Sequence, residues 1–224
     1  MTGSDLELRE LVTAIVAGDG EGVARLLAAS PVLAKASFRA GATRQAEGAY
    51  FLPAIRRYIY AGDTGLHIAA AAYQTEIARM LVAAGADVRA KNRRGQEALH
   101  YAAVGAPGSS TWNPPAQSAT IAFLIMAGAD PNTVDMDGVT PLHRAVRTRC
   151  AEAVRTLLAH GADRARKNKS GSTPMRLARL STGRGGTGSS AAKEQQREIV
   201  RMLEKSPTKE LNAPQQPRSS SDGA

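Results

Sequence analysis

The sequence contains little cysteine and few aromatic residues. Cys150 is the single cysteine among 224 residues, which excludes an internal disulfide and a metal site built from a cysteine cluster. Phe, Trp and Tyr together make up 4% of the chain, and much of the apolar content is Ala and Leu. Because these two residues favour helices whereas strands are rich in aromatic and β-branched residues, the composition predicts closely packed helices.

Long apolar runs are also missing. None approaches the roughly 20 residues that a membrane-spanning helix needs, so we expect no membrane insertion. The N-terminus reads MTGSDLELRE, which is acidic and polar, whereas a secretory signal begins basic and continues apolar. We therefore expect a soluble cytoplasmic protein.

Acidic residues are fewer than basic ones. The chain has 29 Lys and Arg against 20 Asp and Glu, a formal net charge of +9. Such an excess favours association with acidic partners but does not determine the fold.

The most informative feature is an internal repeat of two phrases that keep the same spacing. The first phrase is a tetrapeptide, whose copies are TGLH (64–67), EALH (97–100), TPLH (140–143) and TPMR (173–176). The second phrase occurs as AAGAD (83–87), MAGAD (126–130) and AHGAD (159–163). Successive tetrapeptides start 33, 43 and 33 residues apart, and the second phrase recurs after 43 and 33. Apolar residues at helical spacing lie between the phrases, so each unit is predicted to contain a turn and two helices.

The segment GVTPLHRAVRTRCAEAVRTLLAHGAD (138–163) resembles the ankyrin-repeat family, and the resemblance extends over about residues 62–204. It implies a mainly α fold, a solenoid of stacked helix pairs with β-turn or hairpin fingers. The physical chemistry agrees, because Thr140 can cap the first helix, Pro141 suits its first turn and Gly161 can end the second helix. YAGDTGLHIAAAAY (60–73) is also similar to a set of bacterial ankyrin proteins.

The rest of the chain is arranged around these repeats. Residues 8–31 look like a degenerate helix pair, and the final 19 residues are polar with Pro and Ser, which predicts disorder. FLPAIRRYIY (51–60) is either a packed insertion covering the first repeat or a partner-binding flap. The expected organisation is a helix-pair cap over 1–36, an insertion over 37–61, repeats over about 62–91, 92–134, 135–167 and 168–204, and a disordered tail over 205–224.

Two repeats carry extra residues between their helices, within 105–117 and within 181–193. The second of these contains TGRGGTGSS (182–190), in which Gly183 and Gly188 nearly match a phosphate-binding P-loop. Ser189 stands where the P-loop lysine would be, and a helix rather than a strand precedes the loop. We therefore predict a flexible insertion that binds no nucleotide.

Three histidines occupy the last position of the tetrapeptide, namely His67, His100 and His143. Stacked helices lie roughly 8–10 Å apart, so these rings cannot converge on one zinc ion with bonds of about 2.0–2.1 Å. The resemblance implies a structural histidine that bonds to backbone near the turn. Arg176 replaces it in the fourth unit, which indicates a terminal capping repeat. No metal site and no cofactor are expected.

Several positions depart from the family pattern or stand outside it. Tyr73 and Arg149 take the place of a glycine between paired helices, and a left-handed conformation would cost each about 1 kcal/mol, so we expect a reshaped turn. Cys150 is predicted to be a half-buried inert thiol, although Arg149 beside it could lower its pKa. Trp112 is either an anchor for its inserted loop or a binding hot spot.

No arrangement of catalytic residues is recognisable, so we expect no enzyme activity. Ankyrin proteins typically bind partners with the tips of the fingers and the inner face of the first helices. Two fingers, AKNRRG (90–95) and RARKNKSG (164–171), are basic, whereas TVDMDG (133–138) is acidic. The candidate partner-binding residues carried over are Tyr60, Asp63, Arg93, Arg94, Gln96, Met136, Asp137, Val139, Arg147, Thr148, Arg166, Lys167, Lys169 and Ser172.

The sequence thus predicts a monomeric, non-catalytic adaptor that binds a protein with an acidic patch. The first alternative is a binder of nucleic acid or another anionic surface, because positive charge attracts phosphates. Against it, the fingers carry no aromatic stacking residue and the fold has no groove-reading element. A secreted bacterial effector is a further alternative. The simplest alternative is that the charged fingers are only solvated and bind no partner.

Overall fold

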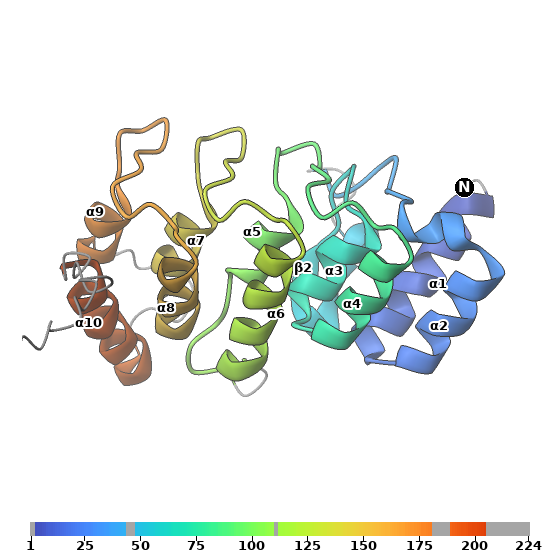
Figure 1. Cartoon of the computed structure of the whole chain (residues 1–224), viewed down its shortest axis with the longest axis horizontal. Helices are drawn as coiled ribbons and strands as arrows, with labels where there is room; N and C mark the ends of the chain where they lie inside the picture. Colours follow the sequence, from blue (N-terminus) through green and yellow to red (C-terminus); the bar gives the residue numbers. More distant parts are fainter. Residues whose placement is uncertain (1–2, 44–47, 110–111, 181–188, 205–224) are drawn as a thin grey trace, which may run out of the picture.

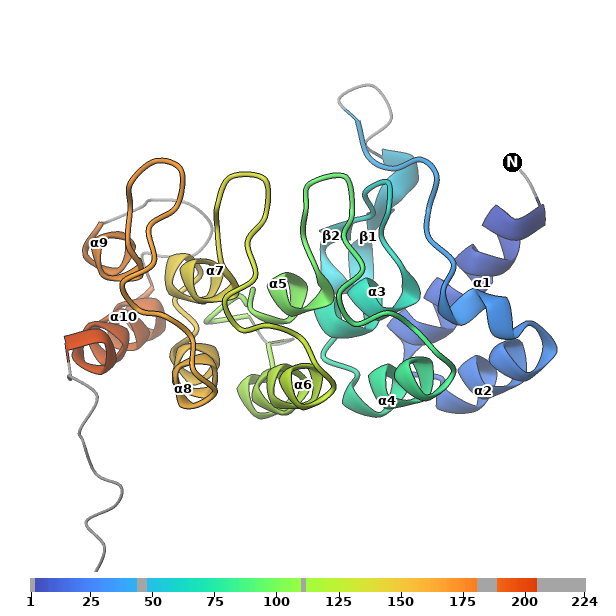
Figure 2. The ribbon, with the colours of Figure 1, turned by 45° about the horizontal axis from the view of Figure 1, so that its top comes forward.

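The computed structural model describes residues 3–43, 48–109, 112–180 and 189–204. Helices stack side by side in two rows, and loops protrude from one edge of the stack (Figures 1 and 2). The first row contains α1 (Gly3–Ala17), α3 (Gly65–Ala71), α5 (Ala98–Ala102), α7 (Pro141–Arg147) and α9 (Pro174–Arg179). The second row contains α2 (Gly20–Ala29), α4 (Thr75–Ala83), α6 (Pro114–Met126), α8 (Ala151–Ala159) and α10 (Ser190–Glu204). The predicted mainly α solenoid is confirmed.

The ends of the helices follow from the repeated phrases. Thr140 caps α7, because its side-chain oxygen accepts a hydrogen bond from the His143 amide at 3.3 Å, and Pro141 occupies the first turn. Gly161 has φ +86° and follows α8, where a left-handed residue stops a helix without steric cost. The predicted caps are therefore confirmed.

The turns between paired helices differ from the expectation. Tyr73 and Arg149 have φ 56° and 59°, so both keep the left-handed conformation and the predicted reshaping is wrong. The Gln74 amide donates to the Ala69 carbonyl and the Cys150 amide to the Ala145 carbonyl, both at 2.9 Å. These bonds satisfy carbonyls at the helix end, and the Tyr73 hydroxyl also donates to the Val104 carbonyl, which holds its side chain in place.

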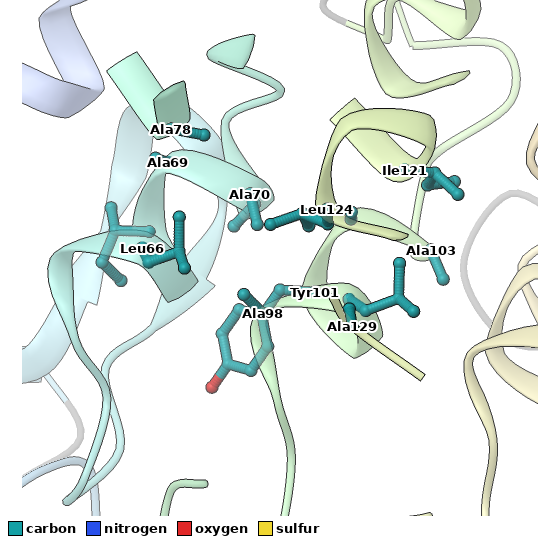
Figure 3. Packing of buried hydrophobic residues seen from close by; sticks show 14 of the residues in the cluster. Leu66, Ala69, Ala70, Ala78, Ala98, Tyr101, Ala103, Ile121, Leu124 and Ala129 are labelled. Atoms are coloured by element: carbon teal, nitrogen blue, oxygen red, sulfur yellow. The ribbon is translucent and has the colours of Figure 1, made fainter. Parts of the chain in front are cut away.

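Leucines at equivalent positions of the repeats form the core. Leu66, Leu99 and Leu142 at the third position of the tetrapeptide are fully buried. Leu124 of α6 is also fully buried and points toward Ala70 of α3 in the preceding repeat (Figure 3). Small alanines allow the helices to approach closely, so each repeat buries its apolar face against its neighbours.

The N-terminal helix pair continues this stack. Leu11 and Ile15 of α1 are fully buried, and a Cβ atom at Gly65 would lie 3.3 Å from both side chains. Asp19 caps α2 by accepting a hydrogen bond from the Gly22 amide at 2.8 Å. The first true repeat therefore packs directly on this pair.

The extra residues of the second repeat are divided between a loop and a helix. The helix α6 has 13 residues, whereas α4 and α8 have 9 each. Asn113 caps α6 by accepting from the Ala116 amide at 3.0 Å, so residues 114–117 extend the helix by one turn rather than the loop. In the fourth repeat α10 begins at Ser190, so residues 190–193 are helical; residues 181–188, with most of TGRGGTGSS, lie outside the described residues, as does the tail 205–224.

In the region 31–60, the described residues, 31–43 and 48–60, form short elements. They are the 3-10 helices η1 (Pro31–Ala34), η2 (Gly48–Tyr50) and η3 (Pro53–Ile55), and the antiparallel hairpin of β1 (Phe51–Leu52) and β2 (Arg57–Tyr58). Phe38 and Ile59 are buried within the core. The segment is thus packed onto the first repeat, beside α3 and α5 (Figure 2).

Candidate protein-binding surface

Three loops between repeats form the fingers, which we call the first (90–95), middle (133–138) and last (164–171) finger. Each contains an Asn or Asp, namely Asn92, Asp135 or Asn168, whose Oδ1 atom accepts hydrogen bonds from two backbone amides further along the loop. These distances lie between 2.9 and 3.1 Å. Such side chains stabilise tight turns. Their regular spacing in the sequence is a signal from which these turns could have been predicted.

Backbone hydrogen bonds also join neighbouring fingers. The Met136 amide donates to the Arg94 carbonyl at 3.0 Å, and the Lys169 amide donates to the Asp137 carbonyl at 2.9 Å. The fingers therefore keep a fixed separation and form a row along one edge of the solenoid (Figure 2). The side chains at the finger tips therefore project from a backbone that hydrogen bonds hold in place.

The three tetrapeptide histidines connect each repeat to the next. In each, Nδ1 accepts from the amide of the helix-capping residue, so Nε2 carries the proton. The Nε2 atoms of His67, His100 and His143 donate to the carbonyls of Gln96, Val139 and Ser172, each at 3.0 Å. The predicted structural role is confirmed. Within the described ranges, no three His, Cys, Asp or Glu side chains are grouped as metal ligands.

Burial keeps two of these imidazoles neutral. Desolvation, assisted by the Arg144 charge, lowers the pKa of His100 to about 4. Desolvation also lowers the pKa of His143. A neutral ring is the form that both accepts and donates a hydrogen bond.

The structure divides the candidate residues by exposure. Tyr60, Val139 and Thr148 are half-buried. The exposed members are Arg93, Arg94, Met136, Asp137, Arg147, Arg166, Lys167 and Lys169.

Three of the candidates are corrected, because Asp63, Gln96 and Ser172 are only 0%, 5% and 9% exposed. Each is the residue directly before a helix cap, where the chain passes between two repeats. The carbonyls of Gln96 and Ser172 accept from the histidines, while the Asp63 carboxylate accepts from Asn92 at 2.8 Å and from Tyr101 at 2.9 Å. Burial raises the pKa of Asp63, and these hydrogen bonds oppose the rise. The three residues support the fingers from within and are not part of their exposed tips.

The middle finger is less acidic on its surface than its sequence indicates. Asp135 is buried and pairs with Arg144 at 2.9 Å. Burial alone would raise the pKa of Asp135, but hydrogen bonds from Arg144, Val139 and Asp137 outweigh it and lower the pKa. Asp137 is exposed at the tip, beside the exposed Met136.

The inserted loop of the second repeat is anchored. Trp112 is half-buried, and its Nε1 donates to Gln117 Oε1 at 2.9 Å. A Cβ atom at Gly105 would lie 2.4 Å from Trp112 Nε1 and 2.7 Å from Cys150 Sγ, so glycine is required there. Cys150 is fully buried rather than half-buried, and burial raises the pKa of its thiol to about 11, which favours the inert form. Trp112 thus acts as an anchor of the loop.

These stacked helix pairs with protruding fingers define a helical-repeat protein. Profiles described as ankyrin repeats match the sequence in two segments, residues 11–109 (3 copies) and residues 124–178 (many copies). The chain belongs to the ankyrin-repeat family. The first match begins inside the N-terminal helix pair, so it includes residues that precede the repeat phrases.

Several curated proteins are similar over half of the chain. The ankyrin repeat and SOCS box protein 16 of Mus musculus is 38% identical over 114 residues, which are 50% of this chain and 24% of that protein. The B-cell lymphoma 3 protein of Homo sapiens is 37% identical over 119 residues, again 50% and 24%. The chain therefore spans about a quarter of the length of these relatives.

A shorter match, 46% identical over 56 residues (25% of this chain and 8% of that protein), is to the 2-5A-dependent ribonuclease of Mus musculus. The relatives' names describe different proteins, so the shared part is the repeat array. Ankyrin repeats are generally protein–protein interaction modules and non-catalytic scaffolds. Among the helices of the described segments, none is both long and apolar enough to cross a bilayer.

Proposed function

We propose that this protein is a cytoplasmic, non-catalytic adaptor that binds an acidic patch of a partner protein through its finger tips and the adjoining inner face. The observation that carries the proposal is the set of exposed basic side chains on the first and last fingers, which are joined through the middle finger by backbone hydrogen bonds. The proposed contact residues are Tyr60, Arg93, Arg94, Met136, Asp137, Val139, Arg147, Thr148, Arg166, Lys167 and Lys169.

The last finger provides the strongest charge for this role. Arg166, Lys167 and Lys169 are exposed, and among the described residues no carboxylate lies within 4.0 Å of their charged groups. Charges at the rim of an interface steer association and act mainly on its rate. An acidic partner would meet these groups first.

A binder of nucleic acid is the second candidate, favoured by the net charge of +9. It predicts that binding follows phosphate density and falls steeply with salt. The fingers, however, present no aromatic ring for base stacking, because the half-buried ring of Tyr60 lies under two arginines. The bacterial source, export as an effector, the monomeric state and the absence of cofactors stay predictions.

The test is affinity capture followed by mass spectrometry, with and without nuclease. Three proteins are compared: the wild type, a last-finger variant with Arg166→Glu, Lys167→Glu and Lys169→Glu, and a control with Lys193→Glu, Arg197→Glu and Arg201→Glu on exposed positions of α10. We expect a nuclease-resistant protein partner that the control retains and the last-finger variant loses. Capture that depends on nucleic acid, or equal loss in both variants, would contradict the proposal.

A further inference from the structure

A cavity of about 130 Å³ lies between the hairpin of β1 and β2 and the inner face of the repeats. Its wall contains four arginines that come from three separate elements. Arg56 and Arg57 belong to the hairpin, Arg94 to the first finger and Arg144 to α7. Figure 2 shows the hairpin beside α3 and α5.

Positive charge in this wall exceeds negative charge. Arg144 pairs with Asp135 at 2.9 Å, whereas among the described residues no carboxylate lies within 4.0 Å of Arg56, Arg57 or Arg94. Burial lowers the pKa of Arg57, and the nearby Arg144 charge adds to this effect. Arg57 is half-buried, and a partly desolvated cation without a counter-ion is less stable than a paired one, so an anion in the cavity would stabilise the site.

The arginines are held in position. Arg57 donates through Nη2 to the Val104 carbonyl at 3.1 Å, and the Arg94 guanidinium lies 4.9 Å from the centroid of the Tyr60 ring. Arg56 has φ 51°, a left-handed conformation that is unfavourable for a residue with a side chain. The hairpin thus places two successive arginines at the cavity at a cost in backbone strain.

One donor in the wall is also unused. Nε of Arg144 is buried and has no hydrogen-bond partner among the described residues. A buried donor without an acceptor costs free energy, and an oxyanion in the cavity could accept from it. Guanidinium groups match carboxylate and phosphate oxygens with two parallel hydrogen bonds.

The size of the cavity restricts the ligand. Its volume is about 130 Å³. Pockets for whole small molecules measure about 300–1,000 Å³. The space therefore suits a single charged group at the end of a longer chain.

We propose that this arginine-lined cavity binds one carboxylate or phosphate group carried on a side chain of the partner protein. The origin of that group rests on the proposed function, because the cavity adjoins the first finger and a partner lying across the fingers would reach it. The cavity would then fix the register of the partner, while the last finger accelerates its approach.

Inorganic phosphate and acetate, each titrated into the protein alone at constant ionic strength, test the cavity without the partner. The variant is Arg56→Gln with Arg94→Gln, two exposed positions. The control is Lys167→Gln with Lys169→Gln, which removes the same charge from the last finger. We expect saturable binding of phosphate and, more weakly, of acetate. The Arg144 Nε–Hε signal in the NMR spectrum should shift on binding, and the cavity variant should weaken binding about tenfold, the loss of one strong hydrogen bond.

Absence of saturable binding, or equal weakening in the control, would overturn the cavity as an anion site. Partner capture by the wild type, the cavity variant and the α10 control then tests the source of the anion. If the cavity variant loses phosphate binding but captures the partner with unchanged affinity, the partner does not supply the group, and the proposed function stands without this inference. If the cavity variant captures the partner less well, the partner is treated with phosphatase. Capture that is lost on treatment indicates a phosphate group, and capture that is retained indicates a carboxylate.

Discussion

In the first finger, the guanidinium groups of Arg93 and Arg94 lie 5.4 and 4.9 Å from the centroid of the Tyr60 ring, and Arg93 also donates to the Ala42 carbonyl. In the last finger, Lys167 and Lys169 are exposed and face no carboxylate in the described part of the chain. Both fingers are basic in sequence. The arginines of the first finger lie against a residue of the insertion, whereas the lysines of the last finger extend into solvent.

The contacts of a charged side chain in a finger therefore depend on the element that lies beside that finger. An arginine that is already oriented loses little side-chain entropy on binding, which suits the first finger to a defined contact. An exposed lysine acts at longer range through its charge, which suits the last finger to the first encounter. Substitutions in each finger and in the packing between them test this division.

The largest effect should come from removing the packing that joins the two fingers. Leu142 is fully buried in α7, between the first and last fingers. Leu142→Ala should lower the free energy of unfolding by about 2–5 kcal/mol, because it leaves a cavity in the stack. Chemical denaturation measures this value, and Leu180→Ala, at an exposed leucine, is the control. Equal effects of the two substitutions would contradict the assignment of the core.

Acid should weaken the histidine connection beneath the fingers. The pKa of His100 is about 4 in the folded protein and about 6.5 when unfolded. Between these values the unfolded chain binds more protons, so stability is full above pH 6.5 and falls as the pH drops toward 4, by about 3 kcal/mol. Denaturation curves measured across this range should show the loss. His100→Gln should flatten the dependence of the unfolding free energy on pH. An unchanged slope would show that other titratable groups cause this dependence.

A moderate effect should follow from removing the ring that holds the first finger. Tyr60→Leu eliminates the contact with Arg93 and Arg94, and each such contact contributes about 0.5–1 kcal/mol at an exposed site. The free energy of unfolding should fall by about 1–2 kcal/mol, and NMR relaxation should show faster motion of both arginine side chains. Unchanged arginine motion would remove the distinction between the two fingers.

The smallest effect on stability should come from the last finger. Reversing Arg166, Lys167 and Lys169 to Glu should change the free energy of unfolding by less than about 0.5 kcal/mol, because exposed substitutions away from special contacts are usually neutral. Thermal melting of the variant and the wild type measures the difference. A large loss of stability would show that these side chains support the fold.

The sequence predicts the fold well because the fold repeats. Most TPLH-like phrases contain a helix-capping residue, a buried leucine and a histidine. The prediction of a helix pair is therefore supported independently in several repeats. The inner residues before each cap were less predictable: Gln96 and Ser172 look like variable polar positions, but their carbonyls accept from histidines in the preceding repeat. Because the acceptor is the backbone carbonyl, this role places little restriction on the identity of the side chain.

Non-repeating segments were the least predictable. Nothing in the phrase FLPAIRRYIY indicates that Arg57 meets Arg144, which is 87 residues later in the sequence, at one cavity. Tyr73 and Arg149 were expected to reshape their turns, whereas the hydrogen bonds of Gln74 and Cys150 keep the left-handed geometry. The meeting of Arg57 and Arg144 depends on tertiary packing, which short-range patterns do not encode, whereas the two turn bonds are local.

The proposal that the basic last finger steers an acidic protein partner is tested by the association rate of the captured partner at several salt concentrations. The wild type, the Arg166→Glu, Lys167→Glu, Lys169→Glu variant and the α10 control are compared. We predict that the wild-type and control rates are high and fall with salt, and that the last-finger variant associates roughly tenfold more slowly at low salt with a similar dissociation rate. Identical association rates and salt dependence in all three proteins would contradict the claim.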